Sequence, residues 1–382
     1  MEPRIHTGNI QLEEAMTSNP TGVLHVYYEP SLSGITRHVS HIIEGLRDEY
    51  RFHVLCSTDD PRIGDFFRDR GVGYTSVPAG RIFTVRGMIK TLFTARGRDW
   101  DIVHIHNLQS LFWASAPSLF LPRTRFIFTP QVVEFDSRFL DRGFFAAWRL
   151  SSFLVKTIIV LTEHQKEVLI RRKIKGADAI YVIPNSLEPE NIAIKSQETS
   201  PSPLPPGRWI VTIGRLVPQK NPDLFASIAS KVCEEFPDIR FAWIGEGPLE
   251  ERLRALLRES GMSDRVILTG FRRDARQILR QAEIFLSTAL WEGMPYSVLE
   301  AMQAGKPVVV SDIDGHRALV EDGRTGYIAR SEENYLEDFN RLIRSAELRE
   351  TMGRASRARF EAEFSFDRFI ERMRLLYTSV AI

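Results

Sequence analysis

The sequence predicts an α/β protein made of two domains, and three observations support this. Short apolar runs alternate with amphipathic segments through most of the chain, which is typical of parallel strands buried on both faces and joined by helices. A Ser- and Pro-rich stretch at 195–208 interrupts the alternation and has the composition of a linker. The length of 382 residues suits two domains of roughly 150 to 200 residues each. We therefore expect two Rossmann-like domains facing each other across a cleft.

The first domain is expected to cover residues 1–190. Its first strand is the apolar run at 22–28, and the segment 34–50 that follows has the apolar period of a helix. Five further apolar runs are predicted as strands: FHVLCS, GYTSVP, DIVHIH, RFIFTP and TIIVLT. Each run is followed by a helix-like segment, which is the order expected for a parallel sheet.

A linker at 191–207 is expected to lead into a second domain at 208–364, followed by a final helix at 365–382. The predicted strands of this domain are WIVTIG, RFAWIG, RVILTG, EIFLST and PVVVSD. From about residue 331 onward the pattern is helical. Open α/β sheets bind ligands at the carboxyl ends of their strands, so the site residues are expected in the strand-to-helix turns.

Composition excludes several classes of protein. The formal net charge of +1 argues against a nucleic-acid binder, which usually carries a strong basic excess. Cys56 and Cys233 lie far apart, which fits a reducing cytoplasm and gives neither a disulfide framework nor a metal cluster. The start MEPRIHTGNIQLEEAM lacks the features of a secretory signal, and no run approaches the roughly 20 apolar residues that span a bilayer. We expect a cytoplasmic protein that at most lies on a membrane surface.

The first turn of the second domain carries two cations. In IGRLVPQKNPDLF, Gly214 and Arg215 follow a predicted strand, and Lys220 precedes a helix that Asn221 could cap and Pro222 could begin. Two cations beside a helix N-terminus favour an anion site. A solvated basic turn is the alternative at this point.

The next turn, IGEGPLEERL, places Gly245 and Gly247 between a strand and a helix. A dinucleotide fingerprint would need a third glycine where Glu250 stands, so a nicotinamide cofactor is disfavoured. Close approach of the backbone to a nucleotide and a simple tight turn both stay open. The sequence contains no Gly-Lys-Ser/Thr phosphate loop.

The stretch WEGMPYSVLEAM holds two carboxylates eight positions apart. Glu292 lies in a turn, and Glu300 lies in a predicted helix that closes at Gly305. The unpaired amides of the first helical turn form a phosphate seat, and a rise of about 1.5 Å per residue puts Glu300 only about a turn beyond it. A nucleoside-diphosphate sugar would fit, with hexose hydroxyls at Glu292, diphosphate at the helix start and ribose at Glu300. The alternative is a helix-end charge and an unrelated surface glutamate.

These motifs together resemble the retaining glycosyltransferases of family four, which have the two-domain GT-B fold. The resemblance extends over nearly the whole chain and is carried by LSGITRHVSHIIEGL, VIPNSLEP, GRLVPQKNPDLF, IGEGPLEERL, LTGF, WEGMPYSVLEAMQAGKPVVVSD, EDGRTGYI and FSFDRF. It implies that the second domain binds the donor, that the first binds the acceptor, and that the final helix packs back on the first domain. Closure of the domains over the donor is then expected.

The resemblance also implies roles for single residues. Glu292 and Glu300 would hold the sugar and the ribose, and Arg215 and Lys220 would stabilise the departing diphosphate. Gly34 would let the first loop approach the donor phosphate. Further substrate-binding residues are expected to be Gly214, Gly245, Gly247, Gly293, Met294, Pro295, Val298 and Leu299.

The implied reaction is transfer of a hexose from a nucleoside-diphosphate sugar, with UDP as the commonest base, to a glycan or lipid-linked sugar. Configuration would be retained by attack on the face from which the phosphate leaves. No metal and no cofactor are expected, because the cations and the helix dipole would replace a divalent ion. The Asp-x-Asp at 312–314 is interpreted as helix capping and acceptor-side polarity.

The acceptor side departs from the family pattern. Gln131 stands where many members have a histidine, and glutamine cannot take a proton at neutral pH. His106 is an alternative imidazole in the cleft, although a packed histidine is an equal interpretation, as it is for His104. Glu134 and Asp136 follow Gln131 and are candidates for contact with the acceptor.

Two alternatives concern partners. Basic, aromatic stretches at 80–98 and 139–156 suit contact with a membrane surface, or else half-buried helices with a solvated basic face. The departure at Gln131 also permits a catalytically silent nucleotide-sugar-binding partner of an active transferase. The joint presence of both cations and both glutamates speaks against that interpretation. A pyridoxal-phosphate phosphorylase on this fold would need a Schiff-base lysine, and none sits in a suitable motif.

Overall fold

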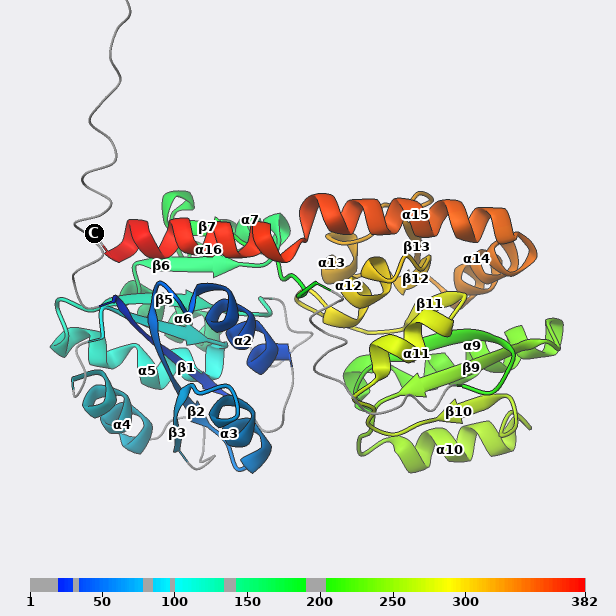
Figure 1. Cartoon of the computed structure of the whole chain (residues 1–382), viewed down its shortest axis with the longest axis horizontal. Coiled ribbons are helices and arrows are strands. Elements are labelled where there is room, and N and C mark those ends of the chain that lie inside the picture. Colours follow the sequence, from blue (N-terminus) through cyan, green and yellow to red (C-terminus); the bar gives the residue numbers. More distant parts are fainter. Residues whose placement is uncertain are drawn as a thin grey trace, which may run out of the picture.

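A computed structural model describes residues 20–29, 34–77, 85–96, 100–133, 142–189 and 204–381. The chain forms two α/β bodies side by side, one from each half of the sequence (Figure 1). Two consecutive helices, α15 (Ala346–Glu363) and α16 (Phe366–Ala381), run along the top of this view, with α15 over the second body and α16 over the first.

The first sheet has seven parallel strands in the order β3-β2-β1-β4-β5-β6-β7. The strands are β1 (Gly22–Tyr28), β2 (Arg51–Ser57), β3 (Gly73–Val77), β4 (Ile102–His106), β5 (Arg125–Thr129), β6 (Thr157–Val160) and β7 (Ile180–Val182). The six predicted strands are confirmed, and β7 was missed. The central strands β1 and β4 are buried along almost their whole length because helices cover both faces of the sheet.

The helices of the first body follow its strands. They are α2 (Gly34–Leu46), α3 (Pro61–Arg68), α4 (Val85–Arg96), α5 (Leu108–Ala114), η2 (Ala116–Phe120), α6 (Arg142–Phe153), α7 (Glu163–Arg171) and η3 (Ala177–Ala179). Capping fixes where some of them begin: the Asp60 carboxylate accepts a hydrogen bond from the Arg62 amide ahead of α3, and Thr162 does the same for Gln165 ahead of α7.

The second sheet has six parallel strands in the order β10-β9-β8-β11-β12-β13. They are β8 (Arg208–Ile213), β9 (Ile239–Ile244), β10 (Val266–Leu268), β11 (Ile284–Ser287), β12 (Val308–Ser311) and β13 (Gly326–Ala329). Five were predicted, and the edge strand β13 was missed. The remaining helices are η4 (Pro218–Lys220), α9 (Pro222–Glu235), α10 (Glu250–Glu259), α11 (Ala275–Gln281), α12 (Tyr296–Gln303), α13 (Asp314–Arg317) and α14 (Glu332–Arg344).

The last helix returns to the first body. Its buried side chains Phe369, Ile370, Met373, Leu376 and Tyr377 share one core with residues of β1, α2 and β4. At Gly45 of α2 an added Cβ would lie 2.1 Å from Ile370 Cδ1, so only a glycine permits this approach of α2 to α16. The end of the chain is therefore part of the core of the first body.

Among the residues described, no helix is both long and apolar enough to cross a membrane. Cys56 and Cys233 are free thiols, and both are buried.

Candidate functional site

The turn between β11 and α12 lies at the centre of the candidate site. Pro295 takes the N-cap position in an extended conformation, and α12 begins at Tyr296. The amide of Leu299 donates to the Pro295 carbonyl at 3.3 Å and makes the first hydrogen bond within the helix. Its side chain and that of Val298 are buried in the core of the second body.

Lys220 and Glu292 meet beside this turn. Lys220 Nζ lies 2.5 Å from Glu292 Oε1, although the residues are 72 positions apart. The turns that carry them are bonded together: Thr288 Oγ1 donates to the Lys220 carbonyl at 2.8 Å, and Gln219 Nε2 donates to the Trp291 carbonyl at 2.8 Å. The structure thus brings these two predicted residues into direct contact, on two turns that are joined by hydrogen bonds.

Asn221 occupies the N-cap position of α9 in a left-handed conformation, with φ of 50°, and its side chain makes no capping bond. Asn221 thus stands at the predicted N-cap position, but the predicted capping by its side chain is wrong. Pro222 begins the helix as predicted, since its missing amide proton costs nothing there.

The two glycines after β9 pack backbone against backbone. A Cβ on Gly245 would lie 2.1 Å from the Gly214 carbonyl oxygen, and one on Gly247 would lie 2.4 Å from the Leu216 carbonyl oxygen. The amide of Leu216 also donates to the Glu246 carbonyl at 2.9 Å. The close contact of two loops is enough to require both glycines, and it fixes the loop that carries the exposed Arg215.

Glu300 lies within α12 and is buried. Its Oε1 accepts from Arg37 Nη1 of α2 at 2.7 Å and from Arg276 Nε of α11 at 3.2 Å. Burial opposes ionisation of this carboxyl, but the two guanidinium groups outweigh it and hold the pKa of Glu300 below its ordinary value. The carboxylate is therefore ionised and bound to both halves of the molecule.

A second carboxylate extends this network. Glu188, which follows β7, lies 3.0 Å from Arg276 Nη1 through Oε1 and 2.6 Å from His41 Nε2 through Oε2. Burial opposes its ionisation, but the bond from His41 and the charge of Arg276 lower the pKa of Glu188. The network connects α2, the chain leaving the first body, α11 and α12. None of Arg37, His41, Glu188 or Arg276 was predicted as a site residue.

Gly34 and Gln131 face the second body from the first. A Cβ on Gly34 would lie 3.4 Å from Tyr296 Cδ2, so the first residue of α2 lies against the first residue of α12. At Gly293 a Cβ would lie 1.8 Å from the Gln131 carbonyl oxygen, which places the predicted acceptor side in contact with the donor-side turn.

Gln131 has a left-handed backbone with φ of 63°, an uncommon conformation for a side-chain-bearing residue. Its buried Nε2 finds no hydrogen-bond partner among the described parts of the chain. A buried amide without a partner is costly, which makes Gln131 a donor ready for a ligand oxygen. Glu134 and Asp136 lie outside the residues described.

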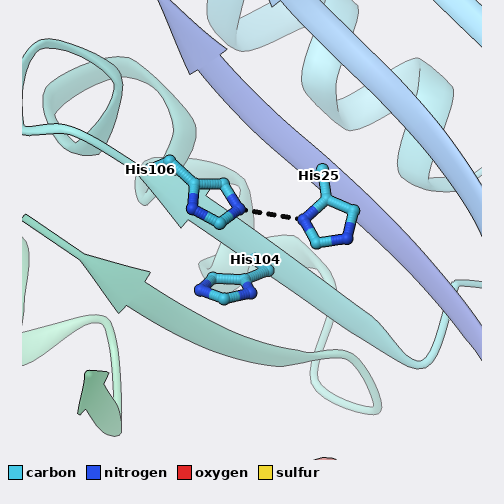
Figure 2. A group of neighbouring side chains, drawn as sticks. All are labelled: His25, His104 and His106. Carbon is cyan, nitrogen blue, oxygen red and sulfur yellow. Dashed lines mark hydrogen bonds between the residues drawn. The ribbon is translucent and has the colours of Figure 1, made fainter. Parts of the chain in front are cut away.

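His106 does not lie in a cleft. It is fully buried in the first body, where its Nε2 shares a hydrogen bond of 2.9 Å with His25 Nδ1 (Figure 2). Burial and the neighbouring imidazoles of His104, His25 and His38 lower the pKa of His106 well below the usual range. The prediction of an acceptor-side role is therefore replaced by the packed interpretation, which applies to His104 as well.

Nitrogen atoms of His25, His104 and His106 lie within 4.8 Å of one another, which is close enough to consider a metal ion. His104 already shares hydrogen bonds with the hydroxyls of Tyr377 at 2.7 Å and Thr129 at 2.8 Å. The rings of His104 and His106 are tilted by 33° to each other with centroids 4.0 Å apart, and no carboxylate of the described residues joins the group. Both ring nitrogens of His104 are therefore already used, and His25 and His106 are hydrogen-bonded to each other. These residues do not fit a metal centre.

The aspartates at 312–314 form ion pairs rather than caps. The N-cap of α13 is Ile313, which makes no side-chain capping bond. Asp312 accepts from Arg317 Nε at 2.6 Å, and Asp314 lies 3.1 Å from His164 Nε2 of the first body. The capping prediction is wrong, because an arginine one turn later competes for these carboxylates.

A cavity of about 550 Å³ opens next to the Met294 turn. Residues of both bodies line it, including His164 and Pro184 from the first and Asp314 and Arg317 from the second. There is thus space between the two bodies beside the candidate site.

Residues 32–191 match the family described as Glycosyltransferase Family 4, and residues 197–359 match Glycosyl transferases group 1. The UDP-Gal:alpha-D-GlcNAc-diphosphoundecaprenol alpha-1,3-galactosyltransferase of Escherichia coli is 27% identical over 96% of this chain and 99% of its own length. The phosphatidylinositol N-acetylglucosaminyltransferase gpi3 subunit of Schizosaccharomyces pombe is 24% identical over 82% of this chain and 70% of its own length.

Solved structures show the same fold. The crystal structure of Anabaena Alr3699/HepE in complex with UDP superposes with a TM-score of 0.77 at 17% identity, covering 94% of this chain and 100% of the other. The lipopolysaccharide outer core galactosyltransferase WaaB superposes with a TM-score of 0.70 at 18% identity, covering 94% and 99%. With both halves of the chain matched in sequence and the two sheets matched in space, the chain is a glycosyltransferase with the GT-B fold and belongs to the family-four, group 1 glycosyltransferases.

Proposed function

We propose that this chain transfers a hexose from a nucleoside-diphosphate sugar to a glycan or lipid-linked sugar, with retention of configuration and without a divalent metal. UDP is the proposed base. The relative from E. coli acts on a diphosphoundecaprenol-linked sugar from a UDP donor and aligns over nearly the full length of both chains, which supports both choices.

The observation that carries the proposal is the arrangement around the start of α12. The Lys220–Glu292 pair lies before the helix and Glu300 lies one to two turns within it. The donor sugar would contact Glu292, the diphosphate would lie at the first amides of α12 near Lys220 and Arg215, and the ribose would reach Glu300. Cations and a helix N-terminus aimed at the leaving diphosphate can stabilise its charge in the transition state. This is the work that a divalent metal does in other transferases.

Gln131 supports the same-face mechanism. Its Nε2, which has no hydrogen-bond partner among the described residues, can donate to a hydroxyl of the transferred sugar, but an amide cannot act as a base. In the proposed reaction the acceptor hydroxyl attacks the anomeric carbon as the bond to the diphosphate oxygen breaks. The same diphosphate oxygen takes the proton of that hydroxyl, so the first body need not supply a base.

A lipid-linked acceptor would lie at a membrane surface, and the first body has a surface that suits one. We call this the apolar–basic face; its described members are Ile89, Lys90, Phe93, Leu119, Phe120, Arg149, Leu150, Phe153 and Lys156. The face lies on α4, η2 and α6 with the segment after it, and α4 and α6 each pack against α5. Leu150 and Phe153 are 72% and 80% exposed, which is unusual for side chains of this size. Apolar side chains among cations favour contact with anionic lipids.

The direct test is the melting temperature of the purified chain with a panel of nucleotide sugars and free nucleotides, with a chelator present throughout. A ligand at 100 times its dissociation constant adds about 2.7 kcal/mol of stability. We expect a shift with UDP and one UDP-sugar that the chelator does not abolish. A shift that requires metal would remove the metal-independent mechanism, and no shift with any nucleotide or nucleotide sugar would contradict the proposed donor site. A shift without any sugar transfer would favour the silent binding partner.

A further inference from the structure

The two oxygens of Glu300 have different surroundings. Both arginine hydrogen bonds, from Arg37 and from Arg276, end on Oε1. Within the described part of the chain, no group donates a hydrogen bond to Oε2. One oxygen is therefore fixed by two cations while the other keeps its capacity to accept.

The arginines are themselves held in place. The guanidinium of Arg37 lies over the Tyr296 ring, 5.2 Å from its centroid, and Arg276 Nη1 lies 3.0 Å from Glu188 Oε1. Side chains held at two points lose less freedom when they bind a third group, so they can fix a carboxylate in one rotamer.

The arginines also come from different halves of the molecule. Arg276 belongs to α11 of the second body, as Glu300 belongs to α12, whereas Arg37 belongs to α2 of the first body. The Arg37 contact joins residues 263 positions apart and exists only while α2 lies against α12. The surroundings of Glu300, which the donor is proposed to contact, therefore depend on whether the two bodies lie against each other.

We propose that Arg37 is a positioning residue for the donor: together with Arg276 it holds Oε1 of Glu300, so that Oε2 is presented to the ribose hydroxyls when the two bodies are closed. This rests on the proposed function, because it assigns the ribose to Glu300. It adds a residue of the acceptor-side body to the recognition of the donor nucleotide. Donor binding and closure would then favour each other, since the ribose contact is best formed in the closed arrangement.

The test compares UDP with 2′,3′-dideoxy-UDP, which lacks the ribose hydroxyls, by titration calorimetry. A site built to bond a hydroxyl rejects the analogue that lacks it. We expect the unsubstituted chain to prefer UDP by about tenfold or more, as one charge-assisted hydrogen bond allows. Glu300→Gln should reduce this preference, and Arg37→Met should reduce it nearly as far. The double variant should be no worse than Glu300→Gln alone.

Two further variants distinguish a positioning role of Arg37 from a non-specific disturbance of the structure. Arg37→Lys keeps the charge but not the planar fork, so it should restore part of the preference. Arg47→Met removes an exposed arginine just beyond the same helix and should leave the preference unchanged.

An unchanged UDP preference in Arg37→Met would overturn the inference, even if both nucleotides bound more weakly. Failure of the unsubstituted chain to bind UDP would overturn the proposed donor instead, so the two failures can be told apart.

Discussion

Lys220 Nζ lies 2.5 Å from Glu292 Oε1, at the point where the turns after β8 and β11 meet. The pair is mostly shielded from water, with 17% and 13% of the two side chains exposed. A cation held by a carboxylate is fixed in place before the donor arrives, which is what electrostatic stabilisation of a leaving group requires. Substitutions of Lys220 and Glu292 therefore test the proposed chemistry most directly.

Lys220→Met is expected to lower the rate of sugar transfer by about 100- to 1000-fold, the usual effect of removing one group that stabilises developing negative charge. Stability should fall by about 1 kcal/mol, since Glu292 loses its partner but still reaches water. Steady-state kinetics and chemical denaturation measure the two effects. Lys231→Met is the matched control, because Lys231 also pairs with a glutamate but lies on the exposed face of α9. Equal kinetic effects in both variants would contradict a role for Lys220.

Glu292→Gln is expected to lower transfer by at least about 100-fold while UDP binding changes by less than about threefold. The reason is that Glu292 is proposed to contact the sugar and not the nucleotide. Transfer assays and calorimetry with UDP provide the comparison. If the protein were a silent binding partner, the unsubstituted chain would show no sugar transfer, and Glu292→Gln should leave its role intact.

Gly293→Ala tests the contact between the two bodies. The new Cβ would lie 1.8 Å from the Gln131 carbonyl oxygen, so the turn or the loop must move. Transfer is expected to fall by more than about tenfold, because misplacing catalytic groups by 1 Å can cost about 100-fold. Gly207→Ala is the control, since its Cβ would make only ordinary contacts from 3.4 Å. Normal transfer by Gly293→Ala would show that the contact is not needed.

The buried histidines predict a loss of stability in acid. Burial lowers the pKa of His38 from 6.5 to about 4, opposed by its bond to Asn185 and helped by nearby His41. Between these pH values the unfolded chain binds a proton at this site and the folded chain does not. The contribution of neutral His38 to the free energy of unfolding is therefore fully present above pH 6.5 and is lost as the pH falls toward 4.

His38→Gln should remove up to about 1.4 kcal/mol per pH unit from the slope of unfolding free energy in that range. Urea unfolding at pH 7, 6 and 5 measures the slope. His164→Gln, at a partly exposed imidazole, is the control. An unchanged slope in His38→Gln would mean that His38 is protonated in the folded state.

Leu150→Ser combined with Phe153→Ser should weaken binding to anionic vesicles by about tenfold or more, because burying each large apolar side chain contributes roughly 1.5 to 3 kcal/mol. Co-sedimentation with vesicles of mixed anionic and neutral lipid measures this. Leu375→Ser is the control, since Leu375 is also highly exposed but lies on α16. Arg149→Glu should weaken binding further at low salt. Equal binding by all variants would remove the membrane contact from the proposal.

Periodicity and turn residues were enough to predict eleven of the thirteen described strands. The apolar runs along β1, β4, β8 and β12 could only be buried on both faces, so the parallel sheets followed from their composition. The strands that were missed, β7 and β13, are short edge strands with partly exposed residues, and their patterns are weak. The Glu292–Glu300 spacing is local, so the turn and helix that carry it could also be predicted.

Contacts between distant segments could not be predicted from the sequence. His106 is buried, but the sequence does not distinguish it from a histidine in a cleft. A histidine at the end of a predicted strand can occupy either position, and only the packing of the sheet decides which. Arg37 and Glu300 are 263 positions apart, and no local pattern relates them. The sequence determined the two sheets and the donor-side turns, because these depend on local periodicity and backbone chemistry. Only the tertiary structure decided which cations hold which carboxylates, because that depends on how α2 of one body lies against α12 of the other.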